Sequence, residues 1–521
     1  MKYPIGVQSF EVLRKDGYVY VDKTDLIYKL AEEHICFLSR PRRFGKSLLL
    51  STLKAYFEGK RELFHGLMIE LLEKEWKKYP VLLFDFNGVD LSRKNGLREY
   101  LSDVMQEAED RYHLSPIITD DVVKHFRSLI VNIQKATGQK VVVLIDEYDK
   151  PLLDLLETGR AEDSTIMEEN RTLLKYFFSV FKATDDYLRF VMLTGITKFS
   201  QVSMFSGFNQ PNDITFDARY EALCGISEME LSFVFAESIH ELAVEKKMDE
   251  EEVKLLLKQR YDGYHFSEKL EDIYNPFSIM NAFDKLKIRD YWFTTGTPSY
   301  LVRLLADSHL SMMDLTGKYY KLDKFVDYKA DKDEPLPMIF QGGYLTIKDY
   351  DAEFSTYLLD FPNAEVKEGF VTLLVNNYLQ MKDDTASWVS SIVKSLRVGH
   401  LEETRRIFTA FLAEIPYTMR PKKESEFYFH YTFYLLMRLI SCYTVYTEKQ
   451  LSEGRADCIV ETDDYVYIFE FKLDGTAGEA LRQIRDRGYD KSYLADSRKV
   501  YLIGASFSSQ TGTIDDWLTE G

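Results

Sequence analysis

A strand-to-helix stretch that ends in Gly-Lys-Ser constrains this chain most strongly. Residues 35–50 read ICFLSRPRRFGKSLLL, so a short apolar run is followed by a tight loop and then by an apolar helix start. This is the order of a P-loop, in which loop N–H groups hold phosphates at a helix N-terminus, the lysine reaches them and the hydroxyl binds Mg²⁺. The full pattern is G-x-x-x-x-G-K-[ST], and Arg40 occupies the position of its first glycine. Taken alone, the stretch leaves an ordinary strand–helix turn open.

A second motif follows a buried strand. Residues 141–145, VVVLI, are continuously apolar, which predicts a strand covered on both faces of a parallel sheet. Asp146 and Glu147 come directly after it, at the end where open α/β sheets bind their ligands. In a P-loop ATPase the first acid holds Mg²⁺ and the second polarises the attacking water. We therefore predict that Asp146 belongs to a magnesium site and that Glu147 is catalytic.

A third predicted strand, residues 187–199, carries Thr194 near its end. A polar side chain there, beside the acidic strand, would face the γ-phosphate of a bound nucleotide. A threonine that simply ends the strand is equally compatible with the sequence. Lys198 and Arg219 are candidate phosphate-facing cations, and their spacing favours neither.

Several motifs together resemble the AAA-ATPase-like family, which is related to archaeal-type ATPases. They lie within roughly residues 3–300 and read RPRRFGKS, LIDEYDKP, LTGITKFS, YDGYHFSE and YNPFSIMNAF. In that family the arginine-rich loop is the usual form, and the resemblance implies ATP at residues 43–47, with Asp146 and Glu147 as the second motif. We predict that ATP and Mg²⁺ are bound by these residues: Arg42, Arg43, Phe44, Gly45, Lys46, Ser47, Asp146 and Thr194, with Ser47 and Asp146 on the metal.

The C-terminal segment 454–475, GRADCIVETDDYVYIFEFKLDG, predicts a hairpin. As a strand, residues 465–472 place Glu470 and Lys472 on one face and the aromatic side chains on the other. With residues 463–464 as a two-residue turn, Asp457 lies directly opposite Glu470, with Cβ atoms ~4.5–5.5 Å apart. Two carboxylates this close repel each other unless a cation lies between them, and Mg²⁺ prefers such oxygen ligands. Asp-Asp is not a preferred turn pair, and a longer loop would break this pairing.

A divalent metal beside a lysine suits phosphodiester hydrolysis, because the metal acidifies a bound water and neutralises charge while the lysine positions the attacking water. From this hairpin alone, an exposed edge with ordinary salt bridges is the alternative. The wider set of residues resembles the PD-(D/E)XK nuclease superfamily over about 415–515: Glu426 on a predicted helix, Asp457, Glu470, Lys472 and Gln483. The resemblance implies that Asp457 and Glu470 bind the metal, that Lys472 is catalytic, and that Glu426 and Gln483 support them.

Composition limits the partners. The formal net charge is −18, so the chain as a whole does not attract nucleic acid, and any contact depends on local basic patches. The candidate patches are Arg40, Arg42, Arg43 and Lys46; Arg420, Lys422 and Lys423; and Arg482, Arg485 and Arg487.

Cysteine spacing and apolar runs bear on the compartment. The cysteines show no C-x-x-C pair, which argues against a zinc site or a disulfide framework: Cys36, Cys224, Cys442 and Cys458. No apolar run reaches the ~18–20 residues that span a bilayer, and the first residues, MKYPIGVQSF, lack the apolar run of a signal peptide. We expect a cytoplasmic protein without membrane contact. The sequence is compatible with a homo-oligomer, because P-loop ATPases often receive an arginine from a neighbouring molecule.

The predicted fold class is α/β, in four parts. These are a P-loop sheet domain at 1–222, a helical or winged-helix lid at 223–328, a linker and helical connector at 329–415, and a nuclease-like α/β domain at 416–521. The predicted function is ATP binding and hydrolysis, joined to Mg²⁺-dependent cleavage of nucleic acid, with DNA as the expected substrate. The alternative is an ATP-switched sensor or interaction protein whose last domain binds nucleic acid without cutting it.

Overall fold

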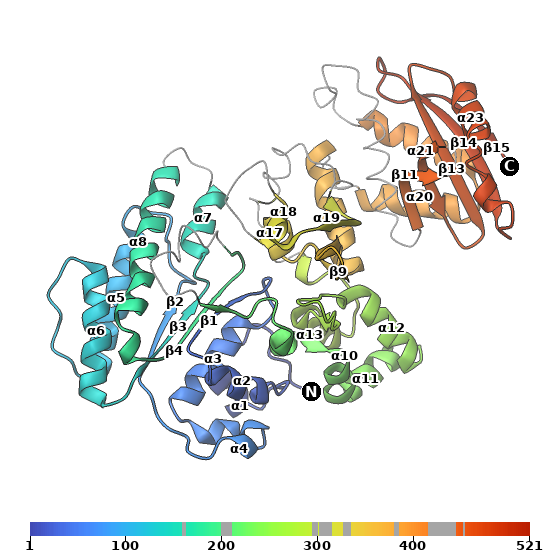
Figure 1. Cartoon of the computed structure of the whole chain (residues 1–521). Helices are drawn as coiled ribbons and strands as arrows, with labels where there is room; N and C mark the ends of the chain where they lie inside the picture. The colour runs from blue at the N-terminus through green and yellow to red at the C-terminus, as the bar shows by residue number, and fades with distance from the viewer. Residues whose placement is uncertain are drawn as a thin grey trace. The chain divides into compact units, whose positions relative to one another are not determined.

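The structure is a computed structural model that describes residues 1–158, 163–198, 211–293, 301, 315–326, 335–379, 385–414, 444–451 and 454–521. The chain divides into two compact units, Met1–Val366 and Lys367–Gly521 (Figure 1). This division falls inside the range 329–415 that the sequence predicted to be a linker and connector. The α/β fold class is confirmed, whereas the boundary after residue 222 stays a prediction.

The first unit is built around a five-stranded sheet in the order β2-β3-β4-β1-β5. Its strands are β1 (Ile35–Ser39), β2 (Val81–Asp85), β3 (Val141–Asp146), β4 (Leu188–Gly195) and β5 (Asn212–Asp213). Every pairing in it is parallel. Apolar residues fill β1 and β3, which are buried along their whole length, as two covered faces require.

Helices cover both faces of this sheet (Figure 1). Helix α3 (Lys46–Phe57), which follows the P-loop, lies against β3 and β4 on one face. On the other face are α5 (Gly96–Arg111), α6 (Val122–Thr137) and α8 (Asp163–Ala183). There Phe84 of β2 packs edge-on against Phe126 and Phe177, whose own rings stack at 4.2 Å.

Strand order decides where the motifs meet. Strand β4 lies between the P-loop strand β1 and the acidic strand β3, with Leu38 opposite Thr194 and Ile145 opposite Leu193. Because all three strands are parallel, their carboxyl ends share one edge of the sheet. The P-loop, Thr194 and Asp146 therefore lie together, as the apolar runs predicted.

A helical part follows the sheet in the same unit. Helices α10 (Glu228–Val234), α11 (Ala236–Lys246), α12 (Glu250–Tyr261) and α13 (Pro276–Lys285) share one apolar core, beside the short pair β6 (Ile226–Ser227) and β7 (Ile273–Tyr274). A three-stranded sheet completes the unit in the order β8-β10-β9. Its strands are β8 (Lys318–Tyr320), β9 (Thr346–Asp351) and β10 (Thr356–Asp360). Between β8 and β9 the chain forms the helices α17 (Leu322–Val326) and α18 (Leu336–Gln341).

The second unit contains a five-stranded sheet in chain order. Its strands are β11 (Thr444–Leu451), β12 (Gly454–Glu461), β13 (Tyr465–Leu473), β14 (Lys499–Phe507) and β15 (Ile514–Glu520). Helix α23 (Ala477–Asp486) packs Leu481 and Ile484 on one face. The other face of β13 carries stacked aromatic rings, and Tyr467 there donates to the carbonyl of Leu396 at 2.5 Å.

The last contact corrects one expectation. Leu396 belongs to α20 (Thr385–Arg397), which is followed by α21 (Leu401–Glu414). We predicted these helices as a connector, but they belong to the second compact unit and contribute to its core. The aromatic side chains of β13 need an apolar cover, and these helices supply part of it. Helix α19 (Ala364–Leu379) precedes them and contains the point where the chain passes between the units.

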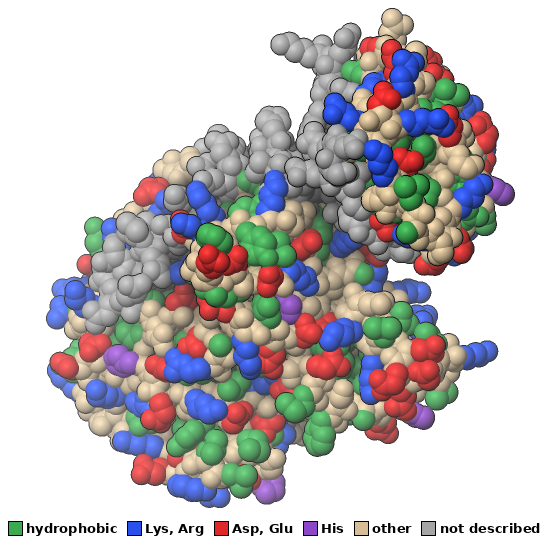
Figure 2. Space-filling model, turned by 45° about the vertical axis from the view of Figure 1, so that its right-hand side comes forward, with side chains coloured by type: hydrophobic (Ala, Val, Ile, Leu, Met, Phe, Trp, Pro, Cys, Tyr) green, Lys and Arg blue, Asp and Glu red, His purple; other side chains and the backbone are tan. Residues whose placement is uncertain are grey.

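Some predictions fall on residues outside the described part of the chain. These are the predicted helix that carries Glu426, the cysteine Cys442, and the basic group Arg420, Lys422 and Lys423. On the face drawn in Figure 2, acidic and basic side chains are interspersed over the described surface, so charge alone marks no nucleic-acid site in that view. None of the described helices is both long enough and apolar enough to cross a membrane.

Candidate functional site

The P-loop has the geometry that its sequence predicted. Gly45 has a φ of +93°, a left-handed conformation that suits glycine, and helix α3 begins at Lys46. No side chain caps this helix start, and uncapped N–H groups at a helix N-terminus bind anions favourably. Lys46 Nζ crosses the loop and donates to the carbonyls of Arg40 at 2.9 Å and Pro41 at 3.0 Å.

A cleft of about 490 Å³ opens over this loop, which is within the range of small-molecule sites, ~300–1,000 Å³. Its polar lining includes Gly45, Lys46, Ser47 and Glu147. Apolar residues of two other segments line it as well: Pro4, Ile5, Val7, Pro276, Phe277 and Met280. A lining with both kinds of residue suits a ligand that carries phosphates and an apolar ring.

The two acids stand differently at the edge of the sheet. Asp146 is buried and accepts hydrogen bonds from Thr194 Oγ1 at 2.7 Å and from the N–H of Glu147 at 3.1 Å. Glu147 has a φ of +51° and lines the cleft. Burial raises the pKa of the Glu147 carboxyl, while nearby Lys46 acts in the opposite direction. Glu147 thus brings to the cleft a carboxyl group, a type of side chain that can accept a proton from water.

In the second unit the hairpin has the predicted register. Cys458 pairs with Phe469 and Glu461 with Val466, which places Asp457 opposite Glu470. The Thr462 N–H donates to the Tyr465 carbonyl at 2.8 Å, closing the two-residue turn. The Asp457 carboxylate accepts from the Phe471 N–H at 2.8 Å, so it is fixed at the end of β13 between the residues of Glu-x-Lys.

Helix α23 completes this second site. Gln483 Nε2 donates to Glu470 Oε1, and Gln483 Oε1 accepts from Lys472 Nζ at 2.8 Å. Lys472 Nζ also lies 3.7 Å from Glu470 Oε1. The helix is held in place by a capping box at its start and by the Ala477 N–H, which donates to Asp516 at 2.8 Å. The predicted residues Asp457, Glu470, Lys472 and Gln483 are therefore brought together.

Two family models match the two parts of the chain that carry these sites. A family model described as "Predicted AAA-ATPase" matches residues 4–205, and a model of the PD-(D/E)XK nuclease superfamily matches residues 424–517. A protein of Azotobacter chroococcum mcd 1, described as an uncharacterized protein in the vnfD 5' region, is 35% identical over 533 residues, covering 100% of this chain and 99% of that protein. The chain belongs to the AAA-ATPase-like family. Its C-terminal part is a PD-(D/E)XK nuclease superfamily domain.

Among solved structures, the Aeropyrum pernix ORC2 protein in its ADPNP–ADP complexes is 12% identical. The match covers 84% of this chain and 86% of that one, with a TM-score of 0.23. A score this low carries no argument about the fold or the function.

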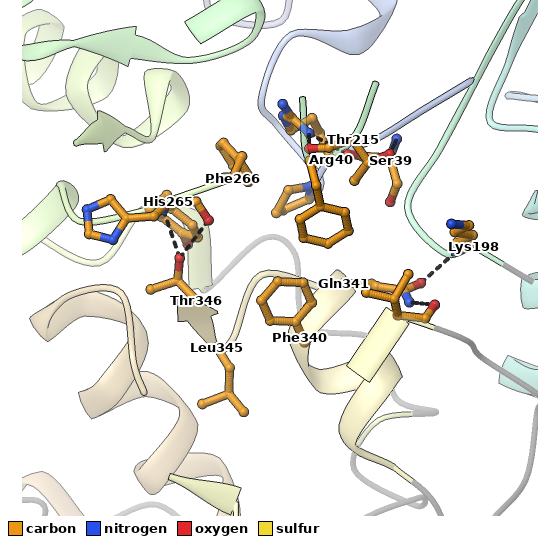
Figure 3. A pocket seen from close by; sticks show the side chains of 14 residues that line it. Ser39, Arg40, Lys198, Thr215, His265, Phe266, Phe340, Gln341, Leu345 and Thr346 are labelled. Carbon is orange, nitrogen blue, oxygen red and sulfur yellow. Dashed lines mark hydrogen bonds between the residues drawn. The ribbon is translucent and has the colours of Figure 1, made fainter. Parts of the chain in front are cut away.

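Arg40 does not line the phosphate cradle of the AAA-ATPase-like domain, contrary to our expectation of an arginine-rich cradle. Its side chain is 1% exposed and donates to the carbonyls of Ser39 at 2.9 Å and Thr215 at 2.8 Å (Figure 3). The guanidinium also lies 4.1 Å from the ring centroid of Phe266, and burial lowers its pKa to about 10. The guanidinium therefore fastens the back of the loop to later segments, because those segments offer carbonyls and a ring.

Other predicted contacts are also corrected. The Phe44 side chain is buried against Tyr264 and Phe266, so only its backbone is available to a nucleotide. Thr194 is fully buried and its hydroxyl bonds Asp146, so it acts on the acid and does not face the cleft. Lys198 pairs with Asp213 at 2.6 Å and Arg219 with Asp217 at 2.6 Å, and neither lines the cleft. By contrast Arg42 and Arg43 do line it, and the Arg43 guanidinium lies 4.8 Å from the Phe277 ring centroid.

Sequence reasoning missed Asp149, which lines the same cleft. This carboxylate is 1% exposed, and its Oδ2 accepts from the N–H groups of Ile196 at 3.0 Å and Thr197 at 2.6 Å and from the Thr197 hydroxyl at 2.7 Å. It joins the loop after β3 to the loop after β4. A signal was present, because Asp149 and its neighbour Lys150 follow the two acids in DEYDKP.

Both sites offer oxygen ligands of the kind that Mg²⁺ prefers, although Asp146 is buried and does not line the cleft. The nuclease superfamily domain offers the carboxylates of Asp457 and Glu470, and the AAA-ATPase-like domain offers Ser47 and Asp146. Among the residues that the structure describes, no three His, Cys, Asp or Glu side chains gather as a metal cage.

A small cavity behind the P-loop is not a second ligand site. It measures about 30 Å³ and is lined by Arg40, Phe266, Phe340, Gln341 and other residues (Figure 3). That volume holds about one water.

Proposed function

We propose that this protein binds and hydrolyses ATP in its first unit. We propose further that its second unit cleaves phosphodiester bonds of nucleic acid, with DNA as the expected substrate. The observation that carries the proposal is the hydrogen-bonded set Glu470, Gln483 and Lys472 beside the fixed carboxylate of Asp457. An exposed hairpin with ordinary salt bridges would not bury Glu470 to 1% exposure.

At the nuclease site each side chain has a separate task. Asp457 and Glu470 would hold Mg²⁺, which supplies charge neutralisation at the phosphate and acidifies a water. Lys472 carries a positive charge to the same place and would orient the attacking water or stabilise negative charge on the phosphate. Gln483 binds both Glu470 and Lys472 and so keeps the acid and the amine at a fixed separation.

At the nucleotide site the phosphates would lie on the α3 N-terminus, where Lys46 exchanges its loop carbonyls for phosphate oxygens. Ser47 and Asp146 would hold Mg²⁺, and Glu147 would take the proton of the attacking water. Arg42 and Arg43 add positive charge along the cleft. The purine ring would lie against the apolar residues of the lining, among them Pro4, Ile5 and Phe277.

The test is cleavage of labelled DNA by the purified protein with Mg²⁺. We expect the wild type to cut, and Lys472→Ala to lose cutting while its thermal unfolding is unchanged. Lys499→Ala is the matched control, because Lys499 is an exposed lysine on the neighbouring strand β14. Equal cleavage by the wild type and Lys472→Ala would exclude the nuclease assignment. DNA binding without cleavage by the wild type would favour the ATP-switched binding protein instead.

A further inference from the structure

Glu365 is a buried carboxylate outside both sites. It is 1% exposed and accepts three hydrogen bonds, from Ser278 Oγ at 2.7 Å, the Tyr291 N–H at 2.5 Å and the Trp292 N–H at 2.7 Å. A buried carboxylate with several donors holds those donors in a fixed arrangement, because leaving any of them unpaired is costly. What the donors are attached to therefore matters.

Two of these donors, Ser278 and Trp292, belong to residues that contact or adjoin the nucleotide cleft. Ser278 lies in the first turn of α13, next to Phe277, which lines the cleft and stacks under the Arg43 guanidinium. Trp292 reaches the P-loop itself, since its indole Nε1 donates to the carbonyl of Arg42 at 2.9 Å. Glu365 thus holds one wall of the cleft and one carbonyl of the phosphate loop at the same time.

Neighbouring contacts fasten this region to the back of the loop. Gly343 approaches Pro41 so closely that an added Cβ would lie 2.6 Å from the proline Cβ. Tyr344, the next residue, packs against Trp292 with ring centroids 5.3 Å apart. The P-loop at Pro41 is thus in close contact with Gly343, and the residue next to Gly343 packs against Trp292.

Glu365 also has a special place in the chain. It is the second residue of helix α19, and the chain passes from the first to the second compact unit inside this helix, between Val366 and Lys367. The segment before it is held within the first unit, because Asn363 Nδ2 donates to the Asp262 carbonyl at 2.8 Å and the Pro362 carbonyl accepts from Lys348 at 2.8 Å.

Resting on the proposed function, we infer that Trp292 and Glu365 are positioning residues that couple nucleotide binding at the P-loop to the nuclease domain through α19. Phosphates that take Lys46 from the carbonyls of Arg40 and Pro41 change the loop at the residues next to Arg42. The Arg42 carbonyl passes this change to Trp292, Trp292 to Glu365, and Glu365 to the first turn of α19.

The experiment uses the full chain and two readouts. The first is the rate of DNA cleavage with Mg²⁺, with and without ATP, which we expect to differ about fivefold or more in the wild type. The second is amide hydrogen exchange over residues 364–379, which we expect ATP to change. Trp292→Phe keeps an aromatic ring but removes the indole donor, and Glu365→Gln keeps the shape but removes the ionisable carboxyl group. Ser278→Ala, which removes a single bond to Glu365, gives a milder third variant.

We expect both main variants to bind ATP and to keep the ATP-free cleavage rate, while ATP changes that rate less than about twofold and no longer alters exchange in α19. Glu109→Gln is the matched control and should respond like the wild type. Glu109 is also a buried glutamate, but it does not line the cleft, and its carboxylate accepts a hydrogen bond of 3.1 Å from the Ile117 N–H. Variants that keep the full wild-type response would overturn the inference, as would a wild type that binds ATP without either response. If the wild type does not cleave DNA, the proposed nuclease function fails. The hydrogen-exchange measurement then still shows whether ATP binding changes helix α19 through Trp292 and Glu365.

Discussion

The two sites differ in how far apart in the sequence their parts lie. The nuclease site takes Asp457, Glu470, Lys472 and Gln483 from one hairpin and the helix that follows it. The nucleotide cleft takes residues from the N-terminal segment, the loops after β1 and β3, and helix α13. Local register thus places the residues of the first site, whereas sheet order and distant packing place those of the second. A motif predicts a residue's role well only where its neighbours are local.

The largest effect is expected at the nuclease site. Glu470→Gln removes the negative charge of a proposed metal ligand, so cleavage should fall about 10³-fold. Removal of Mg²⁺ by a chelator should have the same effect on the wild type. Asp464→Asn, in the turn of the same hairpin, is the control and should cut normally. Cleavage that survives Glu470→Gln would show that the local register does not define the site.

At the cleft, Lys46→Ala should weaken ATP binding on the order of 10²–10³-fold, because charge-assisted contacts to phosphate are lost. Titration with a fluorescent ATP analogue measures this. Lys54→Ala is the control, since Lys54 lies on the same helix but pairs with Glu58 at 2.6 Å. Equal affinity of Lys46→Ala and the wild type would place the nucleotide elsewhere.

Arg40→Gly sharpens the comparison, because it restores the first glycine of the motif. Motif reasoning expects tighter ATP binding. The structure predicts a loss of about 3–5 kcal/mol in the free energy of unfolding, since buried carbonyls lose their donor and Phe266 loses its cation. Urea unfolding measures the change, with Arg40→Lys as a variant that keeps the charge. A stable Arg40→Gly protein that binds ATP more tightly would contradict the structural role.

These outcomes show what the sequence could predict. The apolar runs located β1, β3 and β4, and alternation with a two-residue turn gave the partners of Asp457 and Glu470 correctly. Arg40 was misjudged because its partners, Thr215 and Phe266, lie far along the chain. The same holds for the unit division at Val366, since α20 and α21 join the second unit through contacts with its aromatic face and not through a local signal.

The smallest predicted effect concerns pH. Burial raises the pKa of Glu365 from 4.5 to about 7, with Asp290 adding to it and Ser278 opposing it. The folded protein then binds more protons than the unfolded chain between these values, so stability falls as pH rises from about 4.5 to 7, by roughly 2–3 kcal/mol for this group.

Glu365→Gln should flatten this pH profile in urea unfolding at pH 5–8. Asp262 keeps part of the slope, because burial and nearby Asp272 raise its pKa to about 7 as well. A profile that is as steep in Glu365→Gln as in the wild type would contradict the assignment.

The central claim is that one chain carries two separate chemistries, and a crossed pair of variants tests it most directly. ATP binding and ATP-free, Mg²⁺-dependent DNA cleavage are both measured for Lys46→Ala and Lys472→Ala. We predict that Lys46→Ala loses ATP binding but cuts DNA at the wild-type rate, and that Lys472→Ala binds ATP normally but does not cut. Loss of ATP-free cleavage in Lys46→Ala, or unchanged cleavage in Lys472→Ala, would contradict the account.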